Sequence, residues 1–248
     1  MADKDRHQSI IEHLRKNKTA SVGELSATLF VSPATIRRDL TELQKLGQVE
    51  RTHGGAVYLE NADEISIFVR LSKNAKEKEK AATIALKYIP DFQTVFIDNS
   101  STALALAERM NLQHKTVVTN GLQVAMRLSQ KSDVNIIIPG GEVHYNTNAV
   151  TGSIAISQLM DFRFDLMLSS CAAINLDGSF EHSLDTMQIK KIALERSRRK
   201  LLLADYTKFG LNAMYKTTEL SNYHGIITNA EDYLIAPFRN AGLKIVNK

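Results

Sequence analysis

The 248-residue sequence is short of cysteine and of long apolar runs. Its single cysteine, Cys171, excludes an internal disulfide framework. The apolar runs are too short to cross a bilayer, and residues 1–5 lack the apolar core of a secretion signal. We therefore expect a cytoplasmic protein that makes no contact with a membrane. A glycine-rich dinucleotide fingerprint, internal repeats and low-complexity segments are also missing from the sequence.

The sequence also has no strong excess of positive or negative charge. The formal net charge is +4, from 31 basic and 27 acidic residues. Residues 1–57 carry nine Lys and Arg against seven Asp and Glu, a difference of +2. Bulk charge therefore does not identify a nucleic-acid-binding protein, and such an argument depends on where the arginines lie.

The remaining composition is typical of a globular protein, with 44% hydrophobic and 23% charged residues. The chain is long enough for a small and a medium domain, each with its own core. Changes in sequence pattern predict a first domain over residues 1–58, a linker over 59–74 and a second domain over 75–248.

Residues 31–40, VSPATIRRDL, have the pattern of a helix with a well-defined start. Ser32 is a good N-cap, because its side-chain oxygen can accept from the free N–H groups of the first turn. Pro33 suits the first helical position, where its missing N–H costs nothing. Apolar residues at helical spacing then predict one buried stripe, formed by Ile36, Leu40 and Leu43. The other residues near this helix start are small, polar or cationic: Ala34, Thr35, Arg37 and Arg38.

A second helix is predicted directly before this one. Ser21 and Glu24 have the spacing of a capping box, in which each side chain caps the other's backbone N–H. An apolar stripe comes next, formed by Val22, Leu25 and Leu29. A short turn at residues 30–32 joins the two helices, which predicts a helix-turn-helix over about residues 20–39.

The residues around this motif complete a small DNA-binding domain. Residues 6–16 predict a supporting helix, and Gly47 is placed to end the recognition helix. Residues 49–58 predict a short basic hairpin, a wing, that turns at the glycine pair 54–55.

The recognition helix and the wing supply candidate contacts to double-stranded operator DNA. Small residues permit close approach, threonine can contact base edges or methyl groups, and arginine can bind guanine or phosphate. The candidates are Ser32, Ala34, Thr35, Arg37 and Arg38 on the helix, with Arg51 and His53 on the wing. The alternative, a surface helix with solvated charges, is disfavoured by the helix-turn-helix spacing. Two half-sites on DNA require at least a homodimer, and a homotetramer also fits.

From residue 94 onward, short apolar runs alternate with helices. The predicted strands are 94–98, 116–119, 134–138, 164–169, 200–205, 225–228 and 243–246. Helices are predicted over 75–89 and from near residues 101, 121, 153, 185 and 230. Runs that are apolar on both faces predict an α/β domain with a mostly parallel, doubly wound sheet.

Ligands of open parallel sheets bind at the carboxyl ends of the strands, so the residues directly after each strand are the candidates for a site. The first strand runs into Asp98, Asn99, Ser100, Ser101 and Thr102, which can form an anion-binding turn at a helix start. Asn120 comes after the second strand, Gly140 and Gly141 after the third, and Lys208 after a later one. Each segment alone is explained by ordinary turn chemistry. Three polar strand ends in succession predict a pocket, for which phosphate is the obvious anion.

Two sets of segments in this chain resemble a known group of proteins. Residues 35–40, followed by 51–56, are similar to the N-terminal signature of DeoR-type bacterial transcriptional regulators. Segments of the second half resemble the sensor domain of the same family: 68–70, 77–78, 98–102, 118–120, 140–141, 205–210 and 226–228. The resemblance implies a sensor like the ribose-5-phosphate isomerase and CoA-transferase folds. It also implies that a phosphorylated sugar or related metabolite relieves repression of a carbohydrate catabolic operon.

The resemblance also assigns roles to individual residues. It implies phosphate and hydroxyl contacts from Asp98, Ser100, Ser101, Thr102 and Asn120. Its candidate cations are Arg70, Lys78, Lys190 and Lys208. No metal and no cofactor are implied.

The sequence departs from the family pattern at three places. Ser100 stands where glycine is usual, which predicts a tighter loop or a shifted ligand. Asp185 and Thr186 precede Lys190 where the family often has a glutamate one turn earlier. Residues 170–174 lack a glycine that is common there.

Two other functions fit the sequence less well. A sugar-phosphate isomerase-like enzyme with an accessory DNA-binding head would need a carboxylate base, for which Asp98, Glu181 and Asp185 are available. Nothing in the sequence pairs these acids with an electrophile, and no motif places a base beside Cys171 to make it a nucleophile. An adaptor that binds proteins through the second domain has no positive feature. We therefore expect a non-enzymatic transcriptional repressor.

Overall fold

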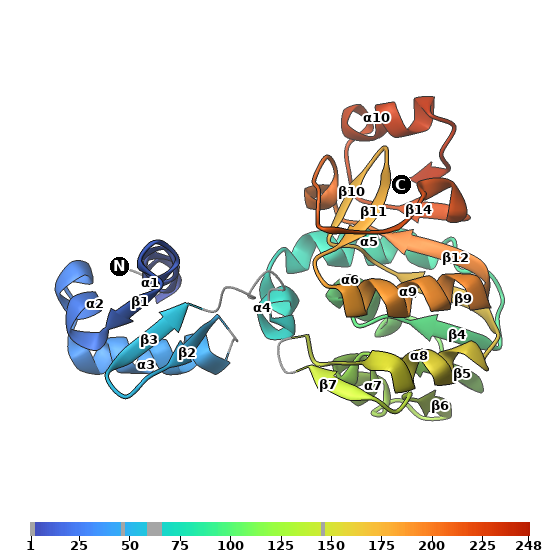
Figure 1. Ribbon diagram of the computed structural model, residues 1–248. Helices are drawn as coiled ribbons and strands as arrows, with labels where there is room; N and C mark the ends of the chain where they lie inside the picture. The colour runs from blue at the N-terminus through green and yellow to red at the C-terminus, as the bar shows by residue number, and fades with distance from the viewer. Residues whose placement is uncertain (1–2, 46–47, 59–65, 145–146) are drawn as a thin grey trace. The chain divides into compact units, whose positions relative to one another are not determined.

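The computed structural model describes residues 3–45, 48–58, 66–144 and 147–248 (Figure 1). It divides into two compact units, Met1–Arg70 and Leu71–Lys248. Among the described residues, no helix has both the length and the apolar character needed to cross a membrane.

The first unit consists of three helices and a small sheet. The helices are α1 (Asp3–Asn17), α2 (Val22–Leu29) and α3 (Pro33–Lys45). The strands are β1 (Thr19–Ser21), β2 (Val49–Arg51) and β3 (Gly55–Tyr58), in the antiparallel order β1-β3-β2. The predicted helix-turn-helix is confirmed as α2 and α3, and the predicted wing as β2 and β3. Strand β1 was not predicted, because three residues are too few to show a periodic pattern.

Local sequence signals start these helices as expected. The Ser21 side chain accepts from the backbone N–H of Glu24 at 3.1 Å, and Glu24 accepts from the N–H of Ser21 at 2.6 Å. The unit is held by one apolar core, formed by Ile10, Leu14, Ala20, Val22, Leu25, Ile36, Leu40, Leu43, Val49 and Ala56. All three residues of the predicted recognition-helix stripe are therefore buried.

The segment after the wing is only partly described. Residues 59–65 and Gly47, which was predicted to end α3, lie outside the described residues. The later part of the predicted linker contains a short helix, α4 (Ile67–Ser72).

The second unit is built on a seven-stranded parallel sheet with the order β15-β14-β12-β9-β4-β5-β6. Its strands are β4 (Thr94–Ile97), β5 (Lys115–Thr119), β6 (Val134–Ile137), β9 (Phe164–Ser169), β12 (Ser197–Leu203), β14 (Gly225–Ile227) and β15 (Ile245–Val246). Each of the seven predicted strands is present, and the predicted parallel sheet is confirmed.

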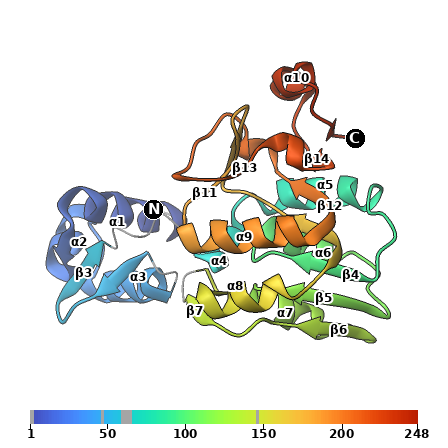
Figure 2. The same ribbon diagram turned by 45° about the vertical axis from the view of Figure 1, so that its right-hand side comes forward.

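Helices cover both faces of this sheet, as Figure 2 shows. One face packs against α5 (Ala75–Leu86), α6 (Ser101–Ala107) and α7 (Leu122–Leu128). The other packs against α8 (Gly152–Met160), α9 (Leu184–Arg196) and α10 (Asp232–Asn240). The fold is a three-layer, doubly wound α/β arrangement, as the strands' apolar character on both faces predicts.

Two smaller antiparallel sheets were not predicted. One is the hairpin of β7 (Glu142–His144) and β8 (Ala149–Thr151). The other joins β10 (Ala173–Asn175), β11 (Gly178–Glu181) and β13 (Tyr215–Thr218), near the short 3-10 helices η1 (Tyr206–Lys208) and η2 (Leu220–Asn222). Their strands are three or four residues long, which is too short to show a periodic pattern, and β7 is exposed throughout.

Candidate DNA-binding surface and effector site

The start of α3 presents a small, polar and cationic surface. The Ser32 side chain accepts from the backbone N–H of Thr35 at 3.2 Å and shares a second hydrogen bond with the Thr35 hydroxyl at 2.9 Å. Thr35 is half-buried, whereas Ser32 is exposed. The other predicted contacts on this helix are also exposed: Ala34, Arg37 and Arg38.

A buried ion pair holds α3 against α1. The Arg6 guanidinium donates to both carboxylate oxygens of Asp39, at 2.5 and 2.8 Å, and both side chains are buried. Burial raises the pKa of Asp39, but the hydrogen bonds and charge of Arg6 outweigh it and hold the pKa below its ordinary value. The pair fixes α3 through its buried residue Asp39, whereas Arg37 and Arg38 of the same helix are exposed. Sequence reasoning missed it, because the partners lie 33 residues apart.

The two predicted wing residues differ in how much of each side chain is exposed and available to contact DNA. His53 is exposed in the turn between β2 and β3. Arg51 is half-buried, and its guanidinium donates to the Thr41 hydroxyl on α3 at 3.0 Å. Arg51 therefore also connects the wing to the recognition helix.

In the second unit, buried polar residues gather at the carboxyl ends of the central strands. Asp98 comes directly after β4, and its carboxylate accepts from the backbone N–H groups of Ser100 and Ser170, both at 3.0 Å. It also accepts from the Ser169 hydroxyl at 2.7 Å. Because β5 and β9 are the two neighbours of β4, Asn120 and Ser169 flank Asp98 at the same edge of the sheet.

A lysine with two carboxylates lies at the centre of this edge. The Lys190 ammonium contacts Asp98 at 2.9 Å, Glu181 at 2.5 Å and the carbonyl oxygen of Ser170 at 2.7 Å. Burial lowers the pKa of Lys190, but the carboxylates of Asp98 and Glu181 outweigh burial and raise it above its ordinary value. Burial likewise raises the pKa of Asp98, and the charge of Lys190 reverses the shift, so that this carboxyl stays ionised.

This arrangement changes the interpretation of Lys190. Its second carboxylate, Glu181, comes from β11 rather than from the preceding turn of α9, where the family pattern places a glutamate. An ammonium group has three N–H donors, and here three oxygen atoms face it. The cluster of Lys190, Asp98 and Glu181 carries one more negative than positive charge. It therefore suits the hydroxyl groups of a ligand better than its phosphate.

Several buried polar atoms at the same edge have no hydrogen-bond partner within the described residues. They are Asn99 Nδ2, Asn120 Oδ1, Thr151 Oγ1 and Asp205 Oδ2. The loops that carry the first three are in contact, since the Asn120 amide donates to the Val150 carbonyl at 3.3 Å. A Cβ on Gly121 would meet the Asn99 Cα at 2.7 Å, so only glycine allows this approach. Buried polar groups are normally paired, and these atoms are free to bind a polar ligand.

The turn from β4 into α6 is closed by its own side chain. Ser100, at φ −81°, accepts from the backbone N–H of Ala103 at 3.1 Å. Glycine is therefore not required at this position, and the serine caps the helix. Asn99, Ser101 and Thr102 are buried beside it.

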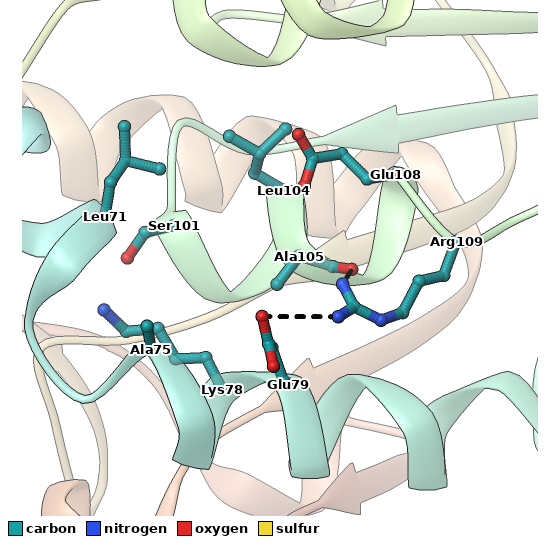
Figure 3. Close-up of a pocket in the computed structure, with 9 residues that line it drawn as sticks. All are labelled: Leu71, Ala75, Lys78, Glu79, Ser101, Leu104, Ala105, Glu108 and Arg109. Carbon is teal, nitrogen blue, oxygen red and sulfur yellow. Dashed lines mark hydrogen bonds and ion pairs between the residues drawn. The ribbon is translucent and has the colours of Figure 1, made fainter.

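A groove lies between the first turn of α5 and the length of α6 (Figure 3). Lys78 and Ser101 both line it, so the structure brings two of the predicted ligand residues together. The Lys78 ammonium donates to the carbonyl of Lys73 at 2.7 Å, and its side chain is buried. Arg109, at the far end, pairs with Glu79 at 3.5 Å.

The loop after β12 carries Asp205 and Lys208 to the same neighbourhood. The charges of both act on the buried thiol of Cys171, as do those of Glu181 and Lys190. Burial raises the pKa of Cys171 to about 12, so the thiol stays protonated and is no nucleophile. Lys208 itself is half-buried on η1.

The remaining predicted residues are Gly140, Gly141 and Arg70. Gly140 and Gly141 are exposed, and the backbone N–H of Gly140 donates to the Gln158 side chain at 2.7 Å. Gly141 has φ +148°, and a Cβ there would meet the Thr151 carbonyl at 2.5 Å, so the chain itself requires this glycine. Arg70 is half-buried on α4 and belongs to the first unit.

The structure also adds residues that the sequence analysis did not select. Ser169 and Ser170 lie at the end of a predicted strand, and the same strand-end rule that selected Asp98 would have found them. Two further contacts tie the start of α5 to the loops of the site: Asn74 donates to Thr207 at 3.2 Å, and Asn229 donates to Glu77. The two partners in these contacts are 133 and 152 residues apart in the sequence, so no local sequence pattern predicts the contacts. Within the described residues, no group of three potential ligand side chains could hold a metal ion.

Comparison with known proteins agrees with both halves of this description. The model of the DeoR-like helix-turn-helix domain matches residues 6–62, and that of the DeoR C-terminal sensor domain matches residues 73–230. The chain is 34% identical over 232 residues to the Glycerol-3-phosphate regulon repressor of Escherichia coli, which covers 93% of this chain and 92% of the relative. It is 31% identical over 246 residues to the HTH-type transcriptional regulator GolR of Listeria innocua, with 97% of each chain covered.

Another relative and two solved structures extend the comparison. The Lactose phosphotransferase system repressor of Staphylococcus aureus is 31% identical, with 92% of each chain covered. Ribose 5-phosphate isomerase A from Methanocaldococcus jannaschii matches 55% of each chain with 15% identity and a TM-score of 0.39. The delta subunit of eIF2B from Chaetomium thermophilum matches 66% of this chain and 59% of its own with 15% identity and a TM-score of 0.46.

The two family models lie on the two units that the structure separates, and the relatives are matched over nearly their whole length. The chain belongs to the DeoR family and is a DNA-binding transcriptional regulator with a C-terminal sensor domain.

Proposed function

We propose that this protein represses a carbohydrate catabolic operon and that a phosphorylated sugar or a related metabolite releases it from operator DNA. The observation that carries the proposal is the set of unpartnered polar atoms of Asn99, Asn120 and Asp205 at the strand ends. The names of two relatives, repressors of a glycerol-3-phosphate regulon and of a lactose phosphotransferase system, point to the same class of effector.

The charges at the site give the effector an orientation. Asp205 and Asn120 offer acceptor oxygens, which sugar hydroxyl groups can satisfy. The excess negative charge around Lys190 disfavours a phosphate there. The phosphate is therefore assigned to the side of Lys78, Ser101 and Lys208, and Lys190 holds Asp98 and Glu181 in place.

The DNA contacts are assigned to the exposed start of α3 and to the wing. Ala34, Arg37 and Arg38 enter the major groove, Ser32 and Thr35 approach the backbone or base edges, and His53 and Arg51 extend the contact. We assign DNA binding to residues 1–58, the connection to 59–74 and sensing to 75–248. Two half-sites require a homodimer or homotetramer.

An effector can shift this equilibrium only by binding one arrangement better than the other. We infer that it binds the DNA-free arrangement more tightly and so acts as an inducer. The isomerase alternative is disfavoured, because Asp98 and Glu181 are both paired with Lys190, and Asp185 lies half-exposed 3.6 Å from His144. Lys190 holds the pKa of Asp98 below its ordinary value, which makes this carboxylate a weak general base.

A gel-shift titration against DNA from around the protein's own gene tests the proposal. Each phosphorylated sugar, including glycerol 3-phosphate, is compared with its unphosphorylated form and with inorganic phosphate. Release by one phosphorylated compound alone supports the proposal and names the effector. Release by none keeps the DNA-binding role and contradicts the proposed effector, whereas turnover of a sugar phosphate would restore the enzyme alternative.

A further inference from the structure

Phe30, in the turn between α2 and α3, has an unusual backbone and an unusual exposure. Its φ is 54° and its ψ 41°, in the left-handed region that favours glycine. Six non-glycine residues of the described chain have positive φ, and the other five are polar or charged: Lys18, Asn74, His114, Asp133 and Asn148. Its side chain is 93% exposed, the highest value for any large apolar residue in the described segments.

Neither feature is explained by the stability of the domain. A bulky side chain in the left-handed region is strained, and glycine would fit this turn without that strain. The exposed ring contributes nothing to the apolar core of the unit, which lies among α1, α2, α3 and the small sheet. Strain held at one exposed position is a reason to look for a function there.

The turn holds Phe30 in a fixed position. Its own backbone N–H and that of Val31 both donate to the carbonyl of Ser26, and the Ser26 hydroxyl donates to the carbonyl of Val31 at 2.5 Å. The ring therefore projects from a hydrogen-bonded turn, at a position two residues before Ser32, the cap of the recognition helix.

We propose that Phe30 is a DNA-contact residue that packs on the deoxyribose carbons or a thymine methyl group at the edge of the operator half-site. The exposed residues just after it, Ser32, Pro33 and Ala34, continue the same surface into the start of α3. When the first turns of a recognition helix enter the major groove, the preceding turn lies against the groove wall, where apolar carbons are available. The inference rests on the proposed docking of α3.

The test measures binding of the full-length chain to the operator duplex found with the wild-type protein. Phe30→Gly and Phe30→Asn both suit the left-handed backbone, so we expect both variants to melt at the wild-type temperature or above it. Loss of the buried ring contact should weaken operator binding about tenfold. The slope of affinity against salt concentration should stay unchanged, because no charge is removed. Phe30→Leu should lie between these variants and the wild type.

Tyr233→Ala is the matched control, since Tyr233 is an aromatic residue of the sensor unit that is 79% exposed. It should bind the operator as the wild type does. Deoxyuridine in place of thymidine at the half-site edge removes only the methyl group. This substitution therefore distinguishes a contact with the thymine methyl group from a contact with the deoxyribose carbons. Weaker wild-type binding to that duplex assigns the methyl, and unchanged binding assigns the deoxyribose.

Wild-type affinity in Phe30→Gly would overturn the proposal. So would a change in its sedimentation that accounts for the lost affinity, because Phe30 would then contact a second copy of the chain. Operator binding by Arg37→Ala, measured in parallel, distinguishes the proposed docking of α3 from the proposed contact by Phe30. If Arg37→Ala loses affinity while Phe30→Gly does not, α3 docks as proposed and the contact by Phe30 fails.

Discussion

Both units bury an ionic cluster, and the two clusters differ in charge balance. In the first unit, the Arg6 guanidinium donates two hydrogen bonds to the buried Asp39 carboxylate, and the half-buried imidazole of His7 lies 3.3 Å from the same carboxylate. In the second, Lys190 faces both Asp98 and Glu181. The charges of Arg6 and Asp39 balance each other, whereas the two carboxylates around Lys190 leave an excess negative charge.

The two clusters also differ in the residues that surround them. Asp39 lies in the DNA-binding unit, next to the buried residue Leu40 of its apolar core. Around Asp98, the structure leaves polar atoms of Asn99, Asn120 and Asp205 without partners among the described residues. The comparison teaches that oppositely charged groups of equal number can fix an element in place, whereas the unbalanced cluster with unpaired neighbours supports the proposed ligand site.

The largest expected effect comes from Lys190→Met. This change leaves two carboxylates buried without their cation, and removing one partner of a buried ionic cluster costs about 5 kcal/mol of folding free energy. Hydrogen exchange resolved by mass spectrometry should show the second unit opening while the first keeps its protection. Lys191→Met is the matched control, because Lys191 is exposed on the same helix. Equal protection in the two variants would contradict the assigned role of Lys190.

Asp39→Asn should have the next largest effect, confined to the first unit. The amide removes the negative charge that faces the buried Arg6 guanidinium, which costs about 3 kcal/mol. Operator binding should fall as well, because α3 loses its anchor to α1. The exposed neighbour Glu42 supplies the control, Glu42→Gln. Lost operator binding with wild-type hydrogen exchange in the first unit would show that Asp39 acts on DNA directly.

Arg37→Ala and Arg38→Ala should each weaken operator binding about tenfold and leave the fold intact. Binding is measured at matched salt, with Arg15→Ala as a control for an exposed arginine of the same unit. A residue that binds phosphate should lower the salt slope, and one that binds guanine should change sequence preference. Unchanged affinity in both variants would refute the assignment of this helix face.

Asp205→Asn should weaken effector binding about tenfold, because a charged acceptor for a ligand hydroxyl is lost. Operator binding without the effector should stay at the wild-type level. The experiment is an isothermal titration of the sugar phosphate identified in the gel-shift screen, with the exposed Asp91→Asn as the control. Wild-type effector affinity in Asp205→Asn would remove this residue from the site.

Mild acid should have the smallest effect. The folded pKa values of Asp39 and Asp98 lie below the ordinary value of 3.8, so both groups stabilise the fold fully above that pH. Their contribution is lost as the pH falls from about 4 through the folded pKa values. The pKa of Lys190 lies above the ordinary 10.5, so its contribution is complete at neutral pH. Burial also lowers the pKa of His224 below its ordinary 6.5, so protonation in mild acid disfavours the fold. Chemical denaturation should therefore show a small loss of stability between pH 7 and pH 5 that His224→Gln removes. A loss that persists in this variant would contradict the shifts of Asp39 and Asp98.

Prediction from sequence succeeded where a signal is local. The capping box of Ser21 and Glu24, the cap at Ser32 and the stripe that begins at Ile36 all lie within one or two helical turns. The seven strands of the sheet were found because each is a short run that is apolar on both faces. Three- and four-residue strands such as β1 and β10 carry no such pattern and were missed.

The sequence alone determined the two-part organisation, the recognition helix, the parallel sheet and the polar strand ends, because periodicity and capping act between residues close in the chain. Only the tertiary structure decided which polar groups are paired. It joined Arg6 to Asp39 and placed Lys190 between Asp98 and Glu181, partners from separate elements whose contact depends on packing. It also left Asp205, Asn99 and Asn120 with polar atoms that have no partner among the described residues, and this difference in pairing supports the proposed ligand site.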